Sequence, residues 1–107
     1  MIIIAGYTRT EARKRDAVVE AFADMVVRAR KFDGCLDLSI SADSVDPERV
    51  NLFECWRDQK ALNAWRKVAK GPRVKLREAY VKLYRSKKAQ KPFLRREASG
   101  RRRGGPR

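Results

Sequence analysis

Along the first 85 residues the spacing of apolar side chains switches between a two-residue period and a period of three to four, which limits the possible folds. The segment 2–8 is apolar and β-branched at its start, which is typical of a covered strand. Between residues 17 and 29 apolar side chains recur at every third or fourth position, which predicts an amphipathic helix. We expect Thr8 or Thr10 to cap this helix and Gly34 to follow its end.

Residues 36–41 and 50–57 alternate between apolar and polar side chains and are joined by a polar turn with Pro47, which predicts a hairpin. The predicted pairs across it are Leu36 with Trp56, Leu38 with Glu54, and Ile40 with Leu52. A second helix is predicted from the cap Asp58 to the break at residues 71–72, with residues 61, 62, 65, 68 and 69 on its apolar face. Residues 80–84 alternate as a last strand.

This order predicts an α+β domain, a ferredoxin-like βαββαβ antiparallel sheet with both helices on one face. The other face of the sheet is left open. Because a core of this size buries only a modest fraction of its apolar surface, we expect a homodimer in which a second copy covers the open face.

Positive charge is concentrated at the C-terminal end of the chain. Residues 1–85 contain 18 basic and 12 acidic residues, whereas residues 86–107 contain nine basic residues and one acidic residue. We therefore divide the chain into a domain, 1–85, and a basic tail, 86–107, which we predict to be disordered and capable of weak, non-specific nucleic-acid contact. The absence of a long apolar run and of a signal-like start predicts a cytoplasmic protein without a membrane partner.

The chain contains no histidine and only two cysteines. A Ser-His-Asp triad, a histidine base, His-ligated zinc and His-held haem are thereby excluded within this chain, and we predict no metal site. Cys35 and Cys55 are expected to be separate free thiols, since their predicted positions on neighbouring strands suit a disulfide poorly. Neither has the surroundings of an activated nucleophile.

Glu54 is the unusual residue of the predicted core, because it alternates with Leu52 and Trp56 on the face assigned to the helices. In one interpretation it forms an ion pair with a basic residue at the sheet edge. In the other it lies in a pocket as a proton acceptor or substrate anchor. Trp56 and Trp65 have two interpretations as well, either as core residues or as pocket residues whose indole N–H donates to a ligand.

Several short motifs resemble those of a known family. They are DGCL at 33–36, the turn at 43–47, LFECWRD at 52–58 and ALNA at 61–64. In this order and spacing the chain resembles antibiotic biosynthesis monooxygenase domains over residues 1–85. The resemblance implies a dimeric α+β barrel, in which the open faces of two sheets meet and each protomer keeps a cavity between sheet and helices.

The same resemblance implies an activity. Some members of the family oxidise quinol-like or anthrone-like aromatics with molecular oxygen and need neither metal nor flavin, while others degrade haem. Trp56 matches the strand tryptophan that lines the pocket of anthrone-oxidising members, although Leu52 and Leu62 stand where those members have Asn and Tyr. Trp65 falls where haem-degrading members have a pocket tryptophan, but their first-strand Asn and later His have no counterpart, which disfavours haem degradation.

Our leading hypothesis is a cofactor-independent monooxygenase that takes a quinol-like or polycyclic aromatic substrate and oxygen. Trp56 would donate to the substrate oxygen, Glu54 would act as base or anchor, and a nearby arginine would hold the anion. The residues expected to bind substrate are Leu36, Leu38, Leu52, Leu62 and Trp65. The alternative is a non-catalytic module of the same fold that binds a small ligand or serves in a stress response.

Overall fold

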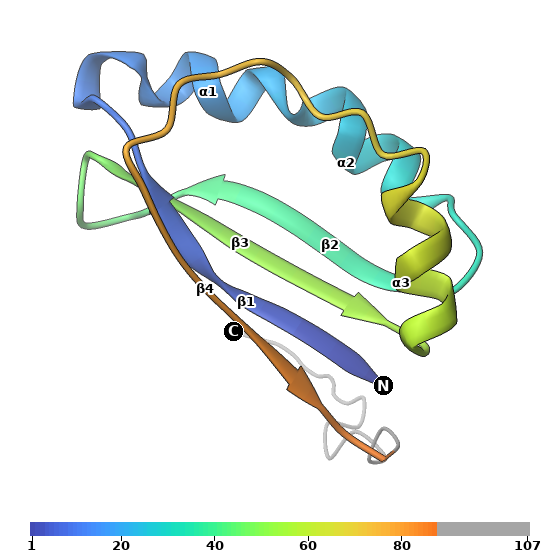
Figure 1. Ribbon diagram of the computed structural model, residues 1–107. Helices are drawn as coiled ribbons and strands as arrows, with labels where there is room; N and C mark the ends of the chain where they lie inside the picture. The colour runs from blue at the N-terminus through green and yellow to red at the C-terminus, as the bar shows by residue number, and fades with distance from the viewer. Residues whose placement is uncertain (88–107) are drawn as a thin grey trace, which may run out of the picture.

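A computed structural model describes residues 1–87 and consists of a four-stranded antiparallel sheet with helices on one face (Figure 1). The strands are β1 (Ile2–Arg9), β2 (Cys35–Ala42), β3 (Arg49–Trp56) and β4 (Glu78–Arg85), in the order β2-β3-β1-β4. The helices are η1 (Ala12–Lys14), α1 (Arg15–Ala21), α2 (Ala23–Arg30) and α3 (Gln59–Arg66). This is the predicted α+β, ferredoxin-like fold. The predicted tail lies outside the described residues, apart from residues 86 and 87.

The first helical segment is more divided than its sequence pattern predicts. It begins with the short turn η1, and α1 and α2 are separated at Phe22. The predicted threonine caps are wrong, because Glu11 precedes η1 and makes no side-chain cap. Thr8 instead lies within β1, where it pairs with Val50 and Ala79, and Thr10 is buried.

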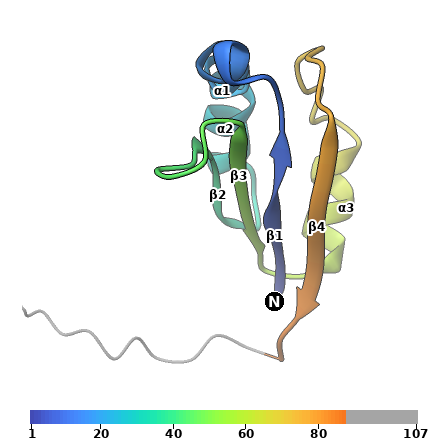
Figure 2. The same ribbon diagram turned by 90° about the vertical axis from the view of Figure 1, so that its left-hand side faces the viewer.

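The second helix begins as predicted, since the Asp58 carboxylate accepts a hydrogen bond from the Ala61 N–H at 2.8 Å. It ends at Arg66, earlier than the pattern predicts, and Val68 is therefore about half exposed. Residues 67–77, the α3–β4 connector, then run without regular structure along the helix side of the molecule to the start of β4 (Figures 1 and 2). Within residues 1–87, no helix has the length and apolarity that crossing a membrane requires.

Most of the predicted hairpin register is confirmed. Ile40 pairs with Leu52, and Leu38 pairs with Glu54. A bulge between Cys35 and Asp37 shifts the last pair, so that Trp56 faces Cys35. Leu36 is the extra residue and is 56% exposed, so it lies outside the core, and its role in substrate binding stays a prediction.

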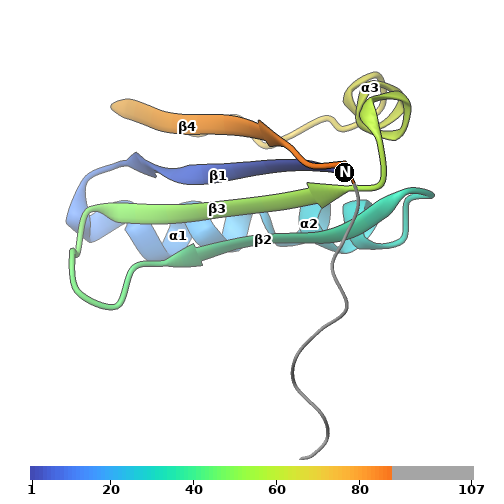
Figure 3. The same cartoon turned by 90° about the horizontal axis from the view of Figure 1, so that it is seen from below.

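The core lies between the sheet and the helices, and Figure 3 shows the sheet from its uncovered side with α1 and α2 behind it. Its buried members are Ile2, Ile4, Ala29, Leu38, Trp56, Ala61, Leu62 and Trp65. Aromatic rings organise one end of it, because Trp56 stacks on Trp65 and Phe32 meets both edge-on. Cys35 and Cys55 are free thiols, as predicted.

Candidate functional site

A cavity of about 220 Å³ lies on the helix side of the sheet, where α1 and α2 meet. It is lined by Thr8, Phe22, Met25, Ile40, Val50, Leu52, Glu54 and Leu76. These residues come from three strands, the α1–α2 junction and the α3–β4 connector. Glu54 is the one ionisable group among them, so any proton chemistry in this cavity passes through its carboxylate.

Glu54 is held in an apolar setting by the pairing of β3. This strand is interior to the sheet, and the residues beside Glu54 are Ile4 on β1 and Leu38 on β2, both buried. The Trp56 indole N–H donates to Glu54 Oε1 at 2.9 Å. No lysine or arginine in residues 1–87 lies within ion-pair distance of Glu54 or lines the cavity. The interpretation of Glu54 as one half of an ion pair at the sheet edge is therefore wrong, and no arginine is found in the cavity lining to hold a substrate anion.

The Trp56 side chain binds Glu54 and does not itself line the cavity. Its side chain is fully buried, and its ring lies 6.0 Å from that of Trp65 at 27°. The Arg28 guanidinium lies 5.8 Å from the centre of the Trp65 ring, which closes this stack on the helix side. Because the Trp56 N–H already has an acceptor in Glu54, it holds the carboxylate in position instead of pointing at a ligand.

The expected substrate-binding residues divide into three groups. Leu52 lines the cavity together with Glu54. Leu38, Leu62 and Trp65 are in the core cluster beside it, and Leu36 is at the surface. Phe22 and Met25 belong to the helical pattern, but nothing in the sequence distinguishes them from ordinary core residues. Leu76 comes from the connector, which has no periodic pattern that could have revealed it.

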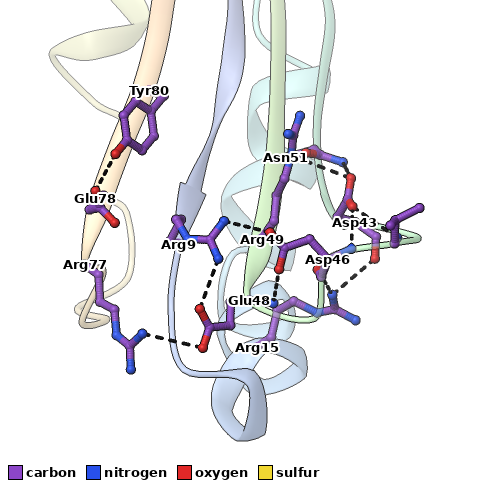
Figure 4. A network of polar contacts seen from close by, with 11 residues as sticks. Arg9, Arg15, Asp43, Asp46, Glu48, Arg49, Asn51, Arg77, Glu78 and Tyr80 are labelled. Carbon is purple, nitrogen blue, oxygen red and sulfur yellow. Dashed lines mark hydrogen bonds and ion pairs between the residues drawn. The ribbon is translucent and has the colours of Figure 1, made fainter.

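A larger hollow of about 560 Å³ lies on the open face of the sheet. Tyr7 and Tyr80 stack there with ring centres 5.0 Å apart, and Arg49 lies over Tyr7 at 3.9 Å. Nearby, Arg9 bonds Asp46 and Glu48 at 2.7 and 3.0 Å and ties the β2–β3 turn to β1 (Figure 4). Arg9 and Arg49 are paired with carboxylates of the β2–β3 turn and its flanks, so we assign this region to the structure rather than to chemistry.

The two thiols are poor nucleophiles. Burial raises the pKa of Cys35, and the negative charges of Asp37 and Glu54 raise it further. Burial also raises the pKa of Cys55. A thiolate is therefore scarce at neutral pH.

The sequence of residues 1–70 matches the family described as "Antibiotic biosynthesis monooxygenase". The chain belongs to the antibiotic biosynthesis monooxygenase family. The match spans β1 to α3 and therefore includes most of the cavity, although Leu76 and the whole of β4 lie beyond it. No curated protein matches the sequence.

Solved structures with the same fold include members of this family. Proteins from Nitrosomonas europaea and Deinococcus radiodurans that carry the family name are 20% and 17% identical, with TM-scores of 0.64 and 0.63. These two matches cover 82% and 87% of this chain and 100% and 99% of the other chains. The heme-degrader MhuD from Mycobacterium tuberculosis is 12% identical, with a TM-score of 0.62 over 85% of this chain and 100% of its own. At these identities the likeness establishes the fold alone.

Proposed function

We propose that this member of the family is a cofactor-independent monooxygenase of a small quinol-like aromatic, with Glu54 as the proton acceptor. The observation that carries the proposal is a single carboxylate in an otherwise apolar cavity, held by the indole N–H of Trp56 at 2.9 Å. A carboxylate at an interior sheet position is costly to bury without a function or a partner. Here it has one hydrogen-bond donor, and the cavity lies beside it.

The cavity volume favours one or two fused rings. A cavity of about 150 Å³ can hold benzene, and pockets for drug-sized ligands begin near 300 Å³. At about 220 Å³, the space between Phe22, Met25 and Leu52 suits a naphthalene-sized quinol better than a polycyclic substrate. The apolar lining would hold the ring, and the hydroxyl would face Glu54.

The proposed oxidation requires few protein groups. Glu54 Oε1 accepts from Trp56, and no described residue donates to Oε2, which can take the proton of the substrate hydroxyl. The resulting anion is electron-rich and is itself the reductant of molecular oxygen. For a 1,4-dihydroxynaphthalene, one oxygen atom of O₂ enters a ring C–H bond as a new hydroxyl, the two original hydroxyls become the carbonyls of a hydroxyquinone, and the second oxygen atom leaves as water with their two hydrogens.

Oxygen uptake with a panel of dihydroxynaphthalenes tests this proposal. We expect Glu54→Gln to lower kcat by about 10²-fold or more, the usual contribution of a general base. Trp56→Phe should lower kcat less, since the carboxylate keeps its place in the cavity but loses the indole N–H that holds it. Glu20→Gln, a substitution at an exposed helix position, is the control and should leave uptake unchanged. Equal rates for all four proteins would refute the role of Glu54.

A non-catalytic ligand-binding module is the second candidate. It is favoured by the lack of any cation or second titratable group in the cavity, because Thr8 is then the one lining side chain whose hydroxyl could donate to a substrate anion. Stoichiometric binding of a dihydroxynaphthalene without oxygen consumption would decide for it. Haem does not fit this site, since the chain has no histidine and, of the usual iron ligands, only Met25 lines the cavity.

A further inference from the structure

We propose that the end of α3 and the α3–β4 connector form a binding surface for the phosphate backbone of nucleic acid. Between Asp58 and Glu78 the chain has no acidic residue. Five basic residues of this stretch form what we call the basic ridge, namely Arg66, Lys67, Lys70, Arg73 and Lys75. A concentration of positive charge of this kind in one surface segment is the usual electrostatic mark of a polyanion site.

The cations of the basic ridge are uncompensated. All five side chains are exposed, and none forms an ion pair or side-chain hydrogen bond with any of residues 1–87. Neighbouring cations behave differently, because Arg77 pairs with Glu48 at 3.6 Å and Arg28 pairs with Asp24 at 2.8 Å. The nearest acid at one end, Glu11, is already paired with Arg13 and Lys14.

The backbone of the ridge is held in place although it has no regular structure. The Arg28 guanidinium donates to the carbonyls of Ala69 and Lys70 at 2.8 and 3.1 Å. At the other end the Arg77 N–H donates to the Arg9 carbonyl at 2.8 Å. These two anchors hold the backbone of the connector along the helix side of the molecule (Figures 1 and 2), so less backbone entropy is lost when the ridge binds a charged partner.

The position of the ridge fits nucleic acid better than a membrane. Residues 66–75 extend for at most about 35 Å, a length that can follow several successive phosphates. Val68 and Leu76 are the large apolar side chains exposed there, and they offer little for insertion into lipid. The ridge lies on the helix side, so it stays uncovered when two copies meet through their open faces.

Fluorescence anisotropy of the full-length protein with a labelled 20-base-pair DNA duplex, over a salt series, tests the proposal. The ridge variant Lys67→Gln, Lys70→Gln, Arg73→Gln should bind at least about tenfold more weakly at 50 mM salt. The slope of log K against log salt is negative, and in this variant its magnitude should fall by about two to three, because each lost phosphate contact releases fewer counterions. The control variant Arg13→Gln, Lys31→Gln, Lys60→Gln removes the same charge at exposed positions outside the ridge and should weaken binding less than about threefold.

Binding by the ridge variant that equals that of the control variant, in affinity and in salt slope, would overturn the proposal. The double variant Lys67→Gln, Lys75→Gln gives a second measure with fewer changes, and it should show about two thirds of the change in slope seen for the triple variant. Vesicles with 30% phosphatidylserine form the other arm of the test. If the ridge substitutions abolish vesicle binding and leave DNA binding intact, the surface is a membrane site and the proposal is wrong. Oxygen uptake should be the same in all these variants, so this test and that of the proposed function fail independently.

Discussion

At the scale of single residues, Asp43 shows how the turn between β2 and β3 is fixed. Its carboxylate accepts from the N–H groups of Asp46 and Val45 at 2.8 and 3.1 Å and from the Asn51 amide at 3.0 Å. These bonds, the one from Asp46 foremost, stabilise the charged form and lower the pKa of Asp43 to about 2. The positive charge of Arg49, 3.6 Å away, acts in the same direction.

The depressed pKa of Asp43 predicts a definite dependence of stability on pH. A carboxyl group whose folded pKa lies below its unfolded value of 3.8 stabilises the fold above that value and loses this contribution as pH falls towards 2. We therefore expect Asp43→Asn to lower the urea midpoint at pH 7, and the gap from wild type to shrink between pH 4 and pH 2. Asp16→Asn, at a 94% exposed carboxylate, is the control and should show no such gap. A gap that stays constant across this range would contradict the assignment.

At the scale of elements, the hairpin register was predictable in its middle and not at its end. Alternation placed Glu54 opposite Leu38 and on the helix side, because a shift by one residue would have turned every apolar side chain outward. The bulge at Leu36 left no such signal, since Leu36 continues the apolar alternation of Leu38 and Ile40 in the sequence, although the extra residue puts Cys35 on their face of the sheet. The cavity was predictable only in part for a similar reason. Leu76 comes from the connector, where apolar residues follow no regular spacing from which its position could be predicted.

Gly34 shows why the DGC motif precedes β2. Its φ of +91° is one that other residues rarely adopt, and a Cβ there would lie 2.4 Å from the Cβ of Ala61 on α3. We expect Gly34→Ala to lower the free energy of unfolding by about 1–3 kcal/mol, measured by urea denaturation. Gly71→Ala is the matched control, because the nearest atom to its Cβ would be the Met25 Sδ at 3.4 Å, and its effect should be within about 0.5 kcal/mol.

At the scale of the whole molecule, the uncovered sheet face is the main apolar surface left over. Phe53, Tyr80 and Tyr84 are 39%, 50% and 53% exposed on it. The family resemblance predicts that a second copy covers this face, and the chemistry of the surface supports that proposal. A small core favours pairing of this kind, because it buries only a modest fraction of the apolar surface, and the sequence therefore predicts it. The identity of the substrate depends instead on a few cavity residues that no pattern in the sequence distinguishes.

Phe53→Glu should convert the proposed dimer into a monomer, because it places a charge at the centre of the face, next to Ala5 and Ser39 on the adjoining strands. Light scattering coupled to size-exclusion chromatography measures the mass directly. Val45→Glu, in the exposed β2–β3 turn, is the control and should remain dimeric. If the Phe53→Glu protein is folded and still dimeric, the interface lies on another surface and the proposal is wrong.

The bulge at Leu36 has a consequence for how these molecules can associate. β2 is an edge strand, and a regular, flat edge is an open template to which the strands of other molecules can add one after another. The extra residue interrupts the row of backbone donors and acceptors at one end of β2 and bends the strand there. On the opposite edge, Lys82 and Arg85 place positive charges along β4, which repel a second copy of the same strand. Both edges thus disfavour fibril-like growth by strand addition, and the proposed pairing through the open face does not use either of them.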